Sequence, residues 1–128
     1  MKQKQLKQYA GVWLDNQQAM IIRSEGDENY SISNKLKSSE NQRSGNEHSM
    51  NNGKQTEQLK YFKAVSEVLA PYDEILIFGP GQSQEQLQSH LKADSQFNNK
   101  QISIDSSGQM TDPQMIAKVR AFFKGRQS

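Results

Sequence analysis

A change of hydrophobic period near Thr56 constrains the fold of this 128-residue chain more than any other feature of its sequence. Before that point the apolar residues fall into short β-type runs. Residues 9–23 form two such runs around a polar break, which favours an antiparallel hairpin. Residues 30–36 partly alternate apolar and polar side chains, as in a strand with one wet face. The chain is therefore predicted to begin with a three-strand antiparallel meander.

From Thr56 the apolar residues recur at helical spacing until Pro71 ends the pattern: Leu59, Phe62, Val65, Val68 and Leu69. A continuous apolar run over 74–78 then predicts a strand that is buried on both faces. The glycines and proline of 79–81 end this strand. Residues 83–86 fit a capping box, with Ser83 as the cap of a helix that runs to about Lys92.

The last third of the chain predicts one more strand and one more helix. Residues 101–105 alternate as a strand does, and 111–114 combine a cap, an early proline and a glutamine at the third helical position. The helix that follows has one apolar stripe, formed by Met115, Ile116, Val119, Phe122 and Phe123.

This order of elements, β-β-β-α-β-α-β-α, predicts an α/β fold with a mixed five-stranded sheet. The strands 74–78 and 101–105 should be parallel and joined by a right-handed crossover, as in the ribonuclease H-like group of folds. The length fits a single domain. We expect that domain to span residues 9–124, with flexible tails at 1–8 and 125–128.

Composition excludes several classes of function. The chain has no cysteine, so it has neither a disulfide framework nor a thiolate zinc site. No apolar run approaches the roughly 18 residues of a membrane span, and we expect no secretory signal, since no apolar region follows the basic first residues. We therefore expect a cytoplasmic protein without a membrane partner or cofactor. A net charge of +2 is too small to imply nucleic acid by itself.

Much of the polar excess lies in residues 38–55, where Met50 is the single hydrophobe. Such a segment is predicted to be a long polar loop, either functional or simple padding. By count, residues 1–64 hold ten Lys or Arg against seven acids. We expect RNA contacts from this half of the chain, while a solvated loop with incidental charge is the alternative. The candidate residues are Arg43, His48, Lys54, Gln55, Lys60 and Lys63.

Catalytic constellations are incomplete in this sequence. A ribonuclease H-type nuclease needs several converging carboxylates for its metal ions. Asp15 and Glu67 are plausible ligands, but the strand 74–78 ends in Phe78 instead of an acid, so we reject a nuclease and expect Asp15 to serve a turn. His48 and His90 form no nucleophile motif and no metal site, and we expect exposed histidines.

The strand-to-helix turn after residue 78 is the best candidate for an anion site. Gly79, Gly81, Gln82 and Ser83 lie at the carboxyl end of a buried strand and at the start of a helix, where free amides and the helix dipole favour anions. The motif lacks the lysine and the glycine spacing of a phosphate-binding loop. A tight turn would explain both glycines without any ligand.

Together these residues resemble a known family. The carrying segments are 11–15 (Gly-Val-Trp-Leu-Asp), 19–22 (Ala-Met-Ile-Ile), 61–62 (Tyr-Phe), 75–81 (Ile-Leu-Ile-Phe-Gly-Pro-Gly) and 110–112 (Met-Thr-Asp). They are similar to small bacterial "translational machinery" proteins, which resemble the middle domain of eukaryotic and archaeal class-1 peptide-chain release factors and of Pelota. The resemblance covers roughly residues 9–124 and implies the same fold.

In release factors, the loop before the first helix carries a Gly-Gly-Gln tripeptide that promotes peptidyl-tRNA hydrolysis. The nearest match here is Gly53-Lys54-Gln55, where Lys54 replaces the second glycine. A lysine side chain blocks the backbone conformations and close approach that glycine permits. The resemblance therefore implies a domain that binds the ribosome or RNA through 38–55 without being an enzyme.

Two other functions stay open at this stage. The chain could be a small protein-interaction or structural module, possibly a homo-oligomer formed through a sheet edge or the terminal helix. Exposure of Phe122 or Phe123 would favour that reading, since exposed apolar patches mark protein interfaces. Residual peptidyl-tRNA hydrolysis through Gln55 is the third reading.

Overall fold

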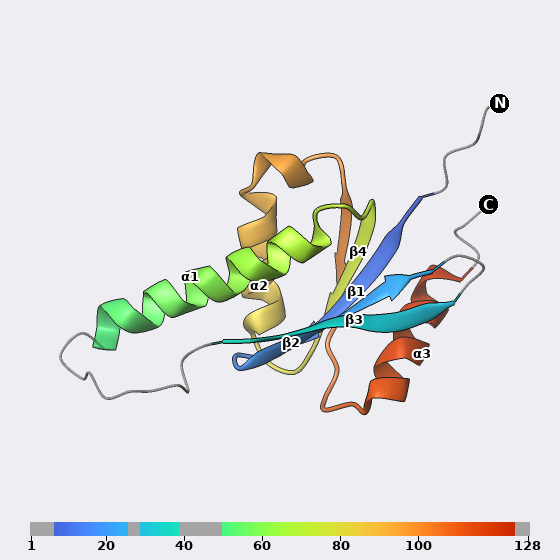
Figure 1. The fold of residues 1–128 in the computed structure, drawn as a ribbon, viewed down its shortest axis with the longest axis horizontal. Helices are drawn as coiled ribbons and strands as arrows, with labels where there is room; N and C mark the ends of the chain where they lie inside the picture. The colour runs from blue at the N-terminus through green and yellow to red at the C-terminus, as the bar shows by residue number, and fades with distance from the viewer. Residues whose placement is uncertain (1–6, 26–28, 39–49, 125–128) are drawn as a thin grey trace.

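The structure is a computed structural model that describes residues 7–25, 29–38 and 50–124, with the backbone alone for residues 50–56. Within these ranges, five strands form one sheet and three α-helices cover its faces (Figure 1). A 3-10 turn, Ser95–Phe97, follows the second of these helices. The elements are β1 (Tyr9–Leu14), β2 (Gln18–Ser24), β3 (Tyr30–Lys37), α1 (Met50–Leu69), β4 (Glu74–Phe78), α2 (Ser83–Lys92), β5 (Gln101–Ile104) and α3 (Asp112–Phe123).

The strands lie in the order β3-β2-β1-β4-β5. The pairs β1–β2 and β2–β3 are antiparallel, whereas β1–β4 and β4–β5 are parallel. The predicted α/β class with a mixed five-stranded sheet is thus confirmed, including the parallel pairing of the last two strands. Strand β5 ends one residue before the predicted boundary at 105.

Two apolar clusters fill the two sides of the sheet. Alternate residues of β1 divide between them: Ala10, Val12 and Leu14 pack beneath α1 and α2, while Tyr9 and Trp13 pack against α3. Figure 1 shows this arrangement, with α3 on the face opposite α1 and α2. Every residue of β4 is buried, as expected for a strand covered on both faces.

Helix α1 begins at Met50, so the polar loop predicted over 38–55 is wrong at its C-terminal end. Residues 39–49 lie outside the described part of the chain. Apolar periodicity detects only the part of a helix that is buried, and the first turns of α1 contain no hydrophobe after Met50. Leu59 is the first residue of the series at helical spacing, but its side chain is 59% exposed, whereas Phe62 one turn later is buried.

The two later helices begin differently. Thr111 caps α3 in the predicted capping box: its Oγ1 accepts from the backbone N–H of Gln114, and Gln114 Oε1 accepts from the backbone N–H of Thr111. The capping box predicted for α2 is wrong: the N-cap is Gln82, which makes no side-chain cap bond, and Ser83 is already the first helical residue.

The chain is held to the sheet before β1 begins. Gln8 lies in the predicted N-terminal tail, yet its backbone N–H donates to Asp73 Oδ2 at 2.8 Å and its carbonyl accepts from the backbone N–H of Asp73 at 2.7 Å. Residues 1–6 and 125–128 of the predicted tails lie outside the described part of the chain. Along the residues described, no helix is both long and apolar enough to cross a membrane.

Candidate functional site

The turn between β4 and α2 is built from glycines for structural reasons. A Cβ on Gly79 would lie 2.2 Å from the backbone oxygen of Leu14, so no side chain fits between β4 and the end of β1. Gly81 has a φ of +107°, which L side chains rarely adopt, although nothing lies within 4 Å of its missing Cβ. These constraints explain both glycines of the predicted anion site without any ligand.

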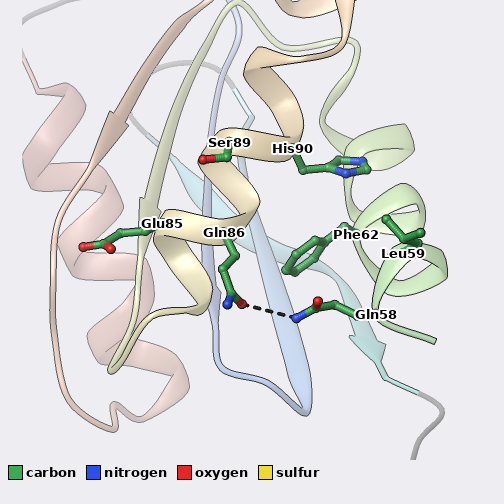
Figure 2. A pocket seen from close by; sticks show the side chains of 7 residues that line it. All are labelled: Gln58, Leu59, Phe62, Glu85, Gln86, Ser89 and His90. Atoms are coloured by element: carbon green, nitrogen blue, oxygen red, sulfur yellow. Dashed lines mark hydrogen bonds between the residues drawn. The ribbon is translucent and has the colours of Figure 1, made fainter. Parts of the chain in front are cut away.

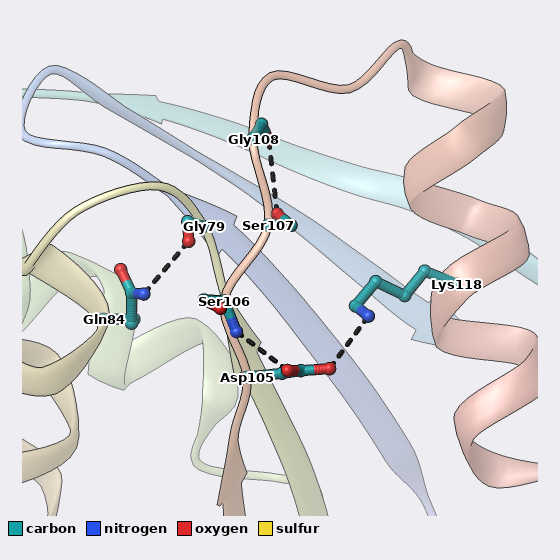
Figure 3. Close-up of polar contacts among 7 residues, drawn as sticks. All are labelled: Gly79, Gln84, Asp105, Ser106, Ser107, Gly108 and Lys118. Carbon is teal, nitrogen blue, oxygen red and sulfur yellow. Dashed lines mark hydrogen bonds and ion pairs between the residues drawn. The ribbon is translucent and has the colours of Figure 1, made fainter.

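The protein itself closes this turn. Gln84 is only 4% exposed, and its Nε2 donates to the Gly79 carbonyl at 3.0 Å (Figure 3). The backbone N–H of Ser107 donates to the same oxygen at 2.9 Å. Gln84 Oε1 is buried without a hydrogen-bond partner, and an unsatisfied acceptor beside the turn disfavours an anion. Sequence reasoning missed Gln84, because a glutamine in the first turn of a helix is normally solvated.

A polar contact joins the end of β5 to α3. Lys118 Nζ lies 2.9 Å from Asp105 Oδ2, and the backbone N–H of Ser106 donates to Asp105 Oδ1 at 2.9 Å (Figure 3). The hydrogen bond from Lys118 and that from Ser106 lower the pKa of the Asp105 carboxyl. Lys118 also lies over the ring of Phe78, with its Nζ 5.8 Å from the centroid. This group therefore anchors α3 to the sheet.

The carboxylates considered for a nuclease are used elsewhere. Asp15 Oδ1 accepts the backbone N–H groups of Gln17 and Gln18 at 2.8 and 2.9 Å, which is the turn role expected for it. Glu67 pairs with Lys63 on the surface of α1. Among the residues the structure describes, no group of three or more His, Cys, Asp or Glu side chains could hold a metal ion.

The candidates for RNA contact divide between described and undescribed parts of the chain. Arg43 and His48 lie outside the described residues. Lys54 and Gln55 lie on the helical backbone of α1, within its first two turns, instead of in a loop. Their side chains belong to the residues for which the backbone alone is described.

The other two candidates, Lys60 and Lys63, are exposed on α1. Lys63 lies 3.7 Å from Glu67 one turn later, and both side chains of this pair are largely in solvent. Such pairs contribute little to stability, so Lys63 can exchange its partner at small cost. The N-terminal half of α1 projects beyond the sheet (Figure 1), and both lysines follow it in the C-terminal half of the helix.

A groove of about 500 Å³ lies between α1 and α2. Figure 2 shows Gln86 and His90 of α2 directed toward α1, while Glu85 and Ser89 point away from it. The groove was not predicted from the sequence. The one signal for it was Leu59, an apolar residue that precedes the first buried residues of α1, Tyr61 and Phe62. The lining residues are Gln58, Leu59, Phe62, Glu85, Gln86, Ser89 and His90.

His90 is half-buried instead of fully exposed as expected. Its ring centroid lies 5.7 Å from that of Phe62, which forms the buried floor of the groove at 5% exposure. Gln58 Nε2 donates to Gln86 Oε1 at 3.2 Å across the groove (Figure 2). Apolar surface and amide groups therefore lie side by side in one open site.

Comparisons with known proteins show the fold and no more than the fold. No family model matches the chain, and no curated protein matches its sequence. Among solved structures, Pelota from Thermoplasma acidophilum is similar with a TM-score of 0.59 and 17% identity, over 96% of this chain and 33% of that one. Pelota from Archaeoglobus fulgidus gives 0.58 and 9% identity, over 91% and 34% of the two chains.

The archaeal translation termination factor aRF1 is similar with a TM-score of 0.57 and 11% identity, over 89% of this chain and 34% of that one. The chain thus spans about a third of the length of each of these proteins. The predicted likeness to a part of the release factors and of Pelota is confirmed at the level of the fold. Membership of the bacterial family stays a prediction.

Proposed function

We propose that this chain is a non-enzymatic domain that associates with the ribosome or with another RNA. The observation that carries the proposal is the fold, which it has in common with a part of an archaeal translation termination factor and of two Pelota proteins. Its relationship to the small bacterial "translational machinery" proteins belongs to the same proposal. Fold alone does not specify function, so the surface of the domain must supply the contact.

The contact element in this proposal is the surface of α1 that carries Lys60 and Lys63, together with the polar residues that precede the helix. The N-terminal half of α1 projects from the sheet (Figure 1), and Lys60 and Lys63 follow it as exposed side chains. Exposed lysines bind RNA through phosphates and release counterions, which makes the association sensitive to salt.

Co-sedimentation of the tagged chain with ribosomal subunits in a salt series tests this proposal. We expect binding at low salt that weakens as salt rises. The double variant Lys60→Ala/Lys63→Ala should dissociate at lower salt than the parent chain. The matched control Lys92→Ala/Lys124→Ala removes two exposed lysines from other parts of the surface and should leave the salt profile unchanged.

Two results would contradict the proposal. The first is a chain that stays at the top of the gradient even at low salt, which shows no association with ribosomes, and that also fails to retain labelled RNA in a filter-binding assay, which shows no association with other RNA. The second is an equal shift of the salt profile by both double variants, which would show that binding depends on the overall charge of the chain and not on the surface of α1.

The absence of enzyme activity is part of the same proposal. Gly53-Lys54-Gln55 lies on helical backbone, and the lysine between glycine and glutamine adds bulk where close approach would be needed. We expect no peptidyl-tRNA hydrolysis above background. If the parent chain hydrolyses peptidyl-tRNA and the Gln55→Ala variant does not, the chain is an enzyme and this part of the proposal is wrong.

A second candidate function, a protein-interaction module, is favoured by one edge of the sheet. Strand β5 lies at that edge and carries Ile104, which is 37% exposed. The terminal helix gives less support, because Phe123 is buried and Phe122 half-buried. Sedimentation of the parent chain and of Ile104→Lys tests this function: a dimer that the lysine dissociates would support it, and a monomer in both cases would not.

A further inference from the structure

The groove between α1 and α2 has a buried floor, Phe62, and an exposed apolar rim. Leu59 is 59% exposed on its α1 side, beside the buried ring of Phe62. A large apolar side chain in water costs free energy that a ligand with an apolar face can recover. The groove therefore has a surface suited to stacking or apolar contact.

Next to this surface lie groups that recognise a polar edge. The amides of Gln58 and Gln86 are joined by one hydrogen bond of 3.2 Å in an exposed position. Each amide group carries two N–H donors and an acceptor oxygen, so both retain donors and acceptors for a ligand. A glutamine amide matches the donor and acceptor pattern of adenine, whose amino group and ring nitrogen it can bind together.

The charges around the groove suit a ligand whose anionic part lies outside it. Lys63 follows Leu59 by one helical turn, so both side chains lie on the same side of α1. Glu85 is the acid that lines the groove, and its side chain points away from α1 (Figure 2). A base in the groove would thus place its phosphates toward Lys63 at the rim formed by Leu59.

We propose that this groove binds one unpaired base of single-stranded RNA, with Leu59 and His90 contacting its face and Gln58 and Gln86 its edge. Recognition of RNA commonly uses such unstacked bases, because their faces and edges are free. The inference rests on the proposed function, since it names the place where this domain would contact RNA.

Titration of labelled hexa-adenylate with the full chain, followed by fluorescence anisotropy, tests the groove. We expect Gln86→Ala and Leu59→Ser each to weaken binding about five- to tenfold. Two matched controls lie on the exposed edge strand β5: Gln101→Ala removes a similar amide, and Ile104→Ser removes a similar exposed hydrophobe. Each control should change the affinity less than about twofold.

The outcomes separate the groove from the proposed function. Binding of RNA or ribosomes that is unchanged in Gln86→Ala and Leu59→Ser overturns the groove and leaves the proposed function standing. Absence of any RNA or ribosome binding by the parent chain overturns both. Self-association that Leu59→Ser abolishes, with unchanged affinity for hexa-adenylate, would assign the groove to a protein contact and overturn the inference. Emission from the buried Trp13 reports whether each variant is folded.

Discussion

A methyl group added at Gly11 is expected to destabilise the domain, because helix α3 lies directly on the strand at this position. A Cβ on Gly11 would be 2.3 Å from Val119 Cγ2 and 3.1 Å from Val119 Cγ1. Val119 is fully buried, so its side chain has no solvent to move into. The helix must shift, or the valine must leave its preferred rotamer.

The expected magnitude follows from two opposing effects. Overpacking of a core costs about 1–3 kcal/mol, whereas replacing a strand glycine by alanine recovers about 0.5–1 kcal/mol of chain entropy. Gly11→Ala should therefore lower the free energy of unfolding by about 1–2 kcal/mol. For a chain of this length, such a loss lowers Tm by roughly 3–8 °C.

Urea unfolding followed by tryptophan emission measures this loss. The chain has one tryptophan, Trp13, which is 1% exposed and lies in the same apolar cluster as Val119. Gly108→Ala is the matched control, since nothing lies within 4 Å of the missing Cβ. This control should change the free energy of unfolding by less than about 0.5 kcal/mol.

A double variant shows whether the contact itself is responsible. Val119→Ala alone should cost about 2 kcal/mol, from the two lost methyl groups and the space they leave. In Gly11→Ala/Val119→Ala the new methyl occupies part of that space. The double variant should then lose at least about 1 kcal/mol less than the sum of the single variants. Strict additivity, or a Gly11→Ala variant as stable as the parent chain, would refute the reasoning.

Three further predictions concern single contacts. Gly79→Ala should lower Tm more than Gly81→Ala, since the first methyl meets a backbone oxygen and the second only an unfavourable φ; equal losses would contradict this. Burial and the charge of Asp15 raise the pKa of Tyr61, whose hydroxyl donates to the Asp15 carbonyl at 3.0 Å. The stability linked to this raised pKa is complete below the ordinary tyrosine pKa and is lost as the pH rises above it. In urea unfolding, Tyr61→Phe should therefore cost about 1 kcal/mol at neutral pH and should lose less stability than the parent chain at alkaline pH. Lys118→Met should raise the pKa of Asp105 toward its ordinary value, which NMR titration measures. In the parent chain, the stability linked to the lowered pKa is present above the ordinary value of 3.8 and is lost as the pH falls below it. A titration of Asp105 that the variant leaves unchanged would contradict the last prediction.

The sequence by itself determined the type and order of the strands and helices, because hydrophobic periodicity is local, although it missed the first turns of α1 and the cap of α2. The uninterrupted apolar run of β4 predicted a strand covered on both faces, and every residue of that strand is buried. The cap, the proline and the glutamine before α3 act within one helical turn, and their hydrogen bonds form as expected. The order of these elements was enough to predict the mixed sheet.

The tertiary structure alone decided where helices lose their cover and which polar groups are enclosed. Leu59 has the spacing of a core residue, but α1 extends past the sheet there, so the side chain lies in a groove. The turn after β4 places the Gly79 carbonyl within reach of the Gln84 amide, so this side chain is buried with a hydrogen bond. Ser83 has the sequence context of a cap, but the helix begins one residue earlier, with Gln82 as the N-cap. Whether a side chain is buried depends on which neighbouring elements reach it, and that is set by the packing of segments that lie far apart in the chain.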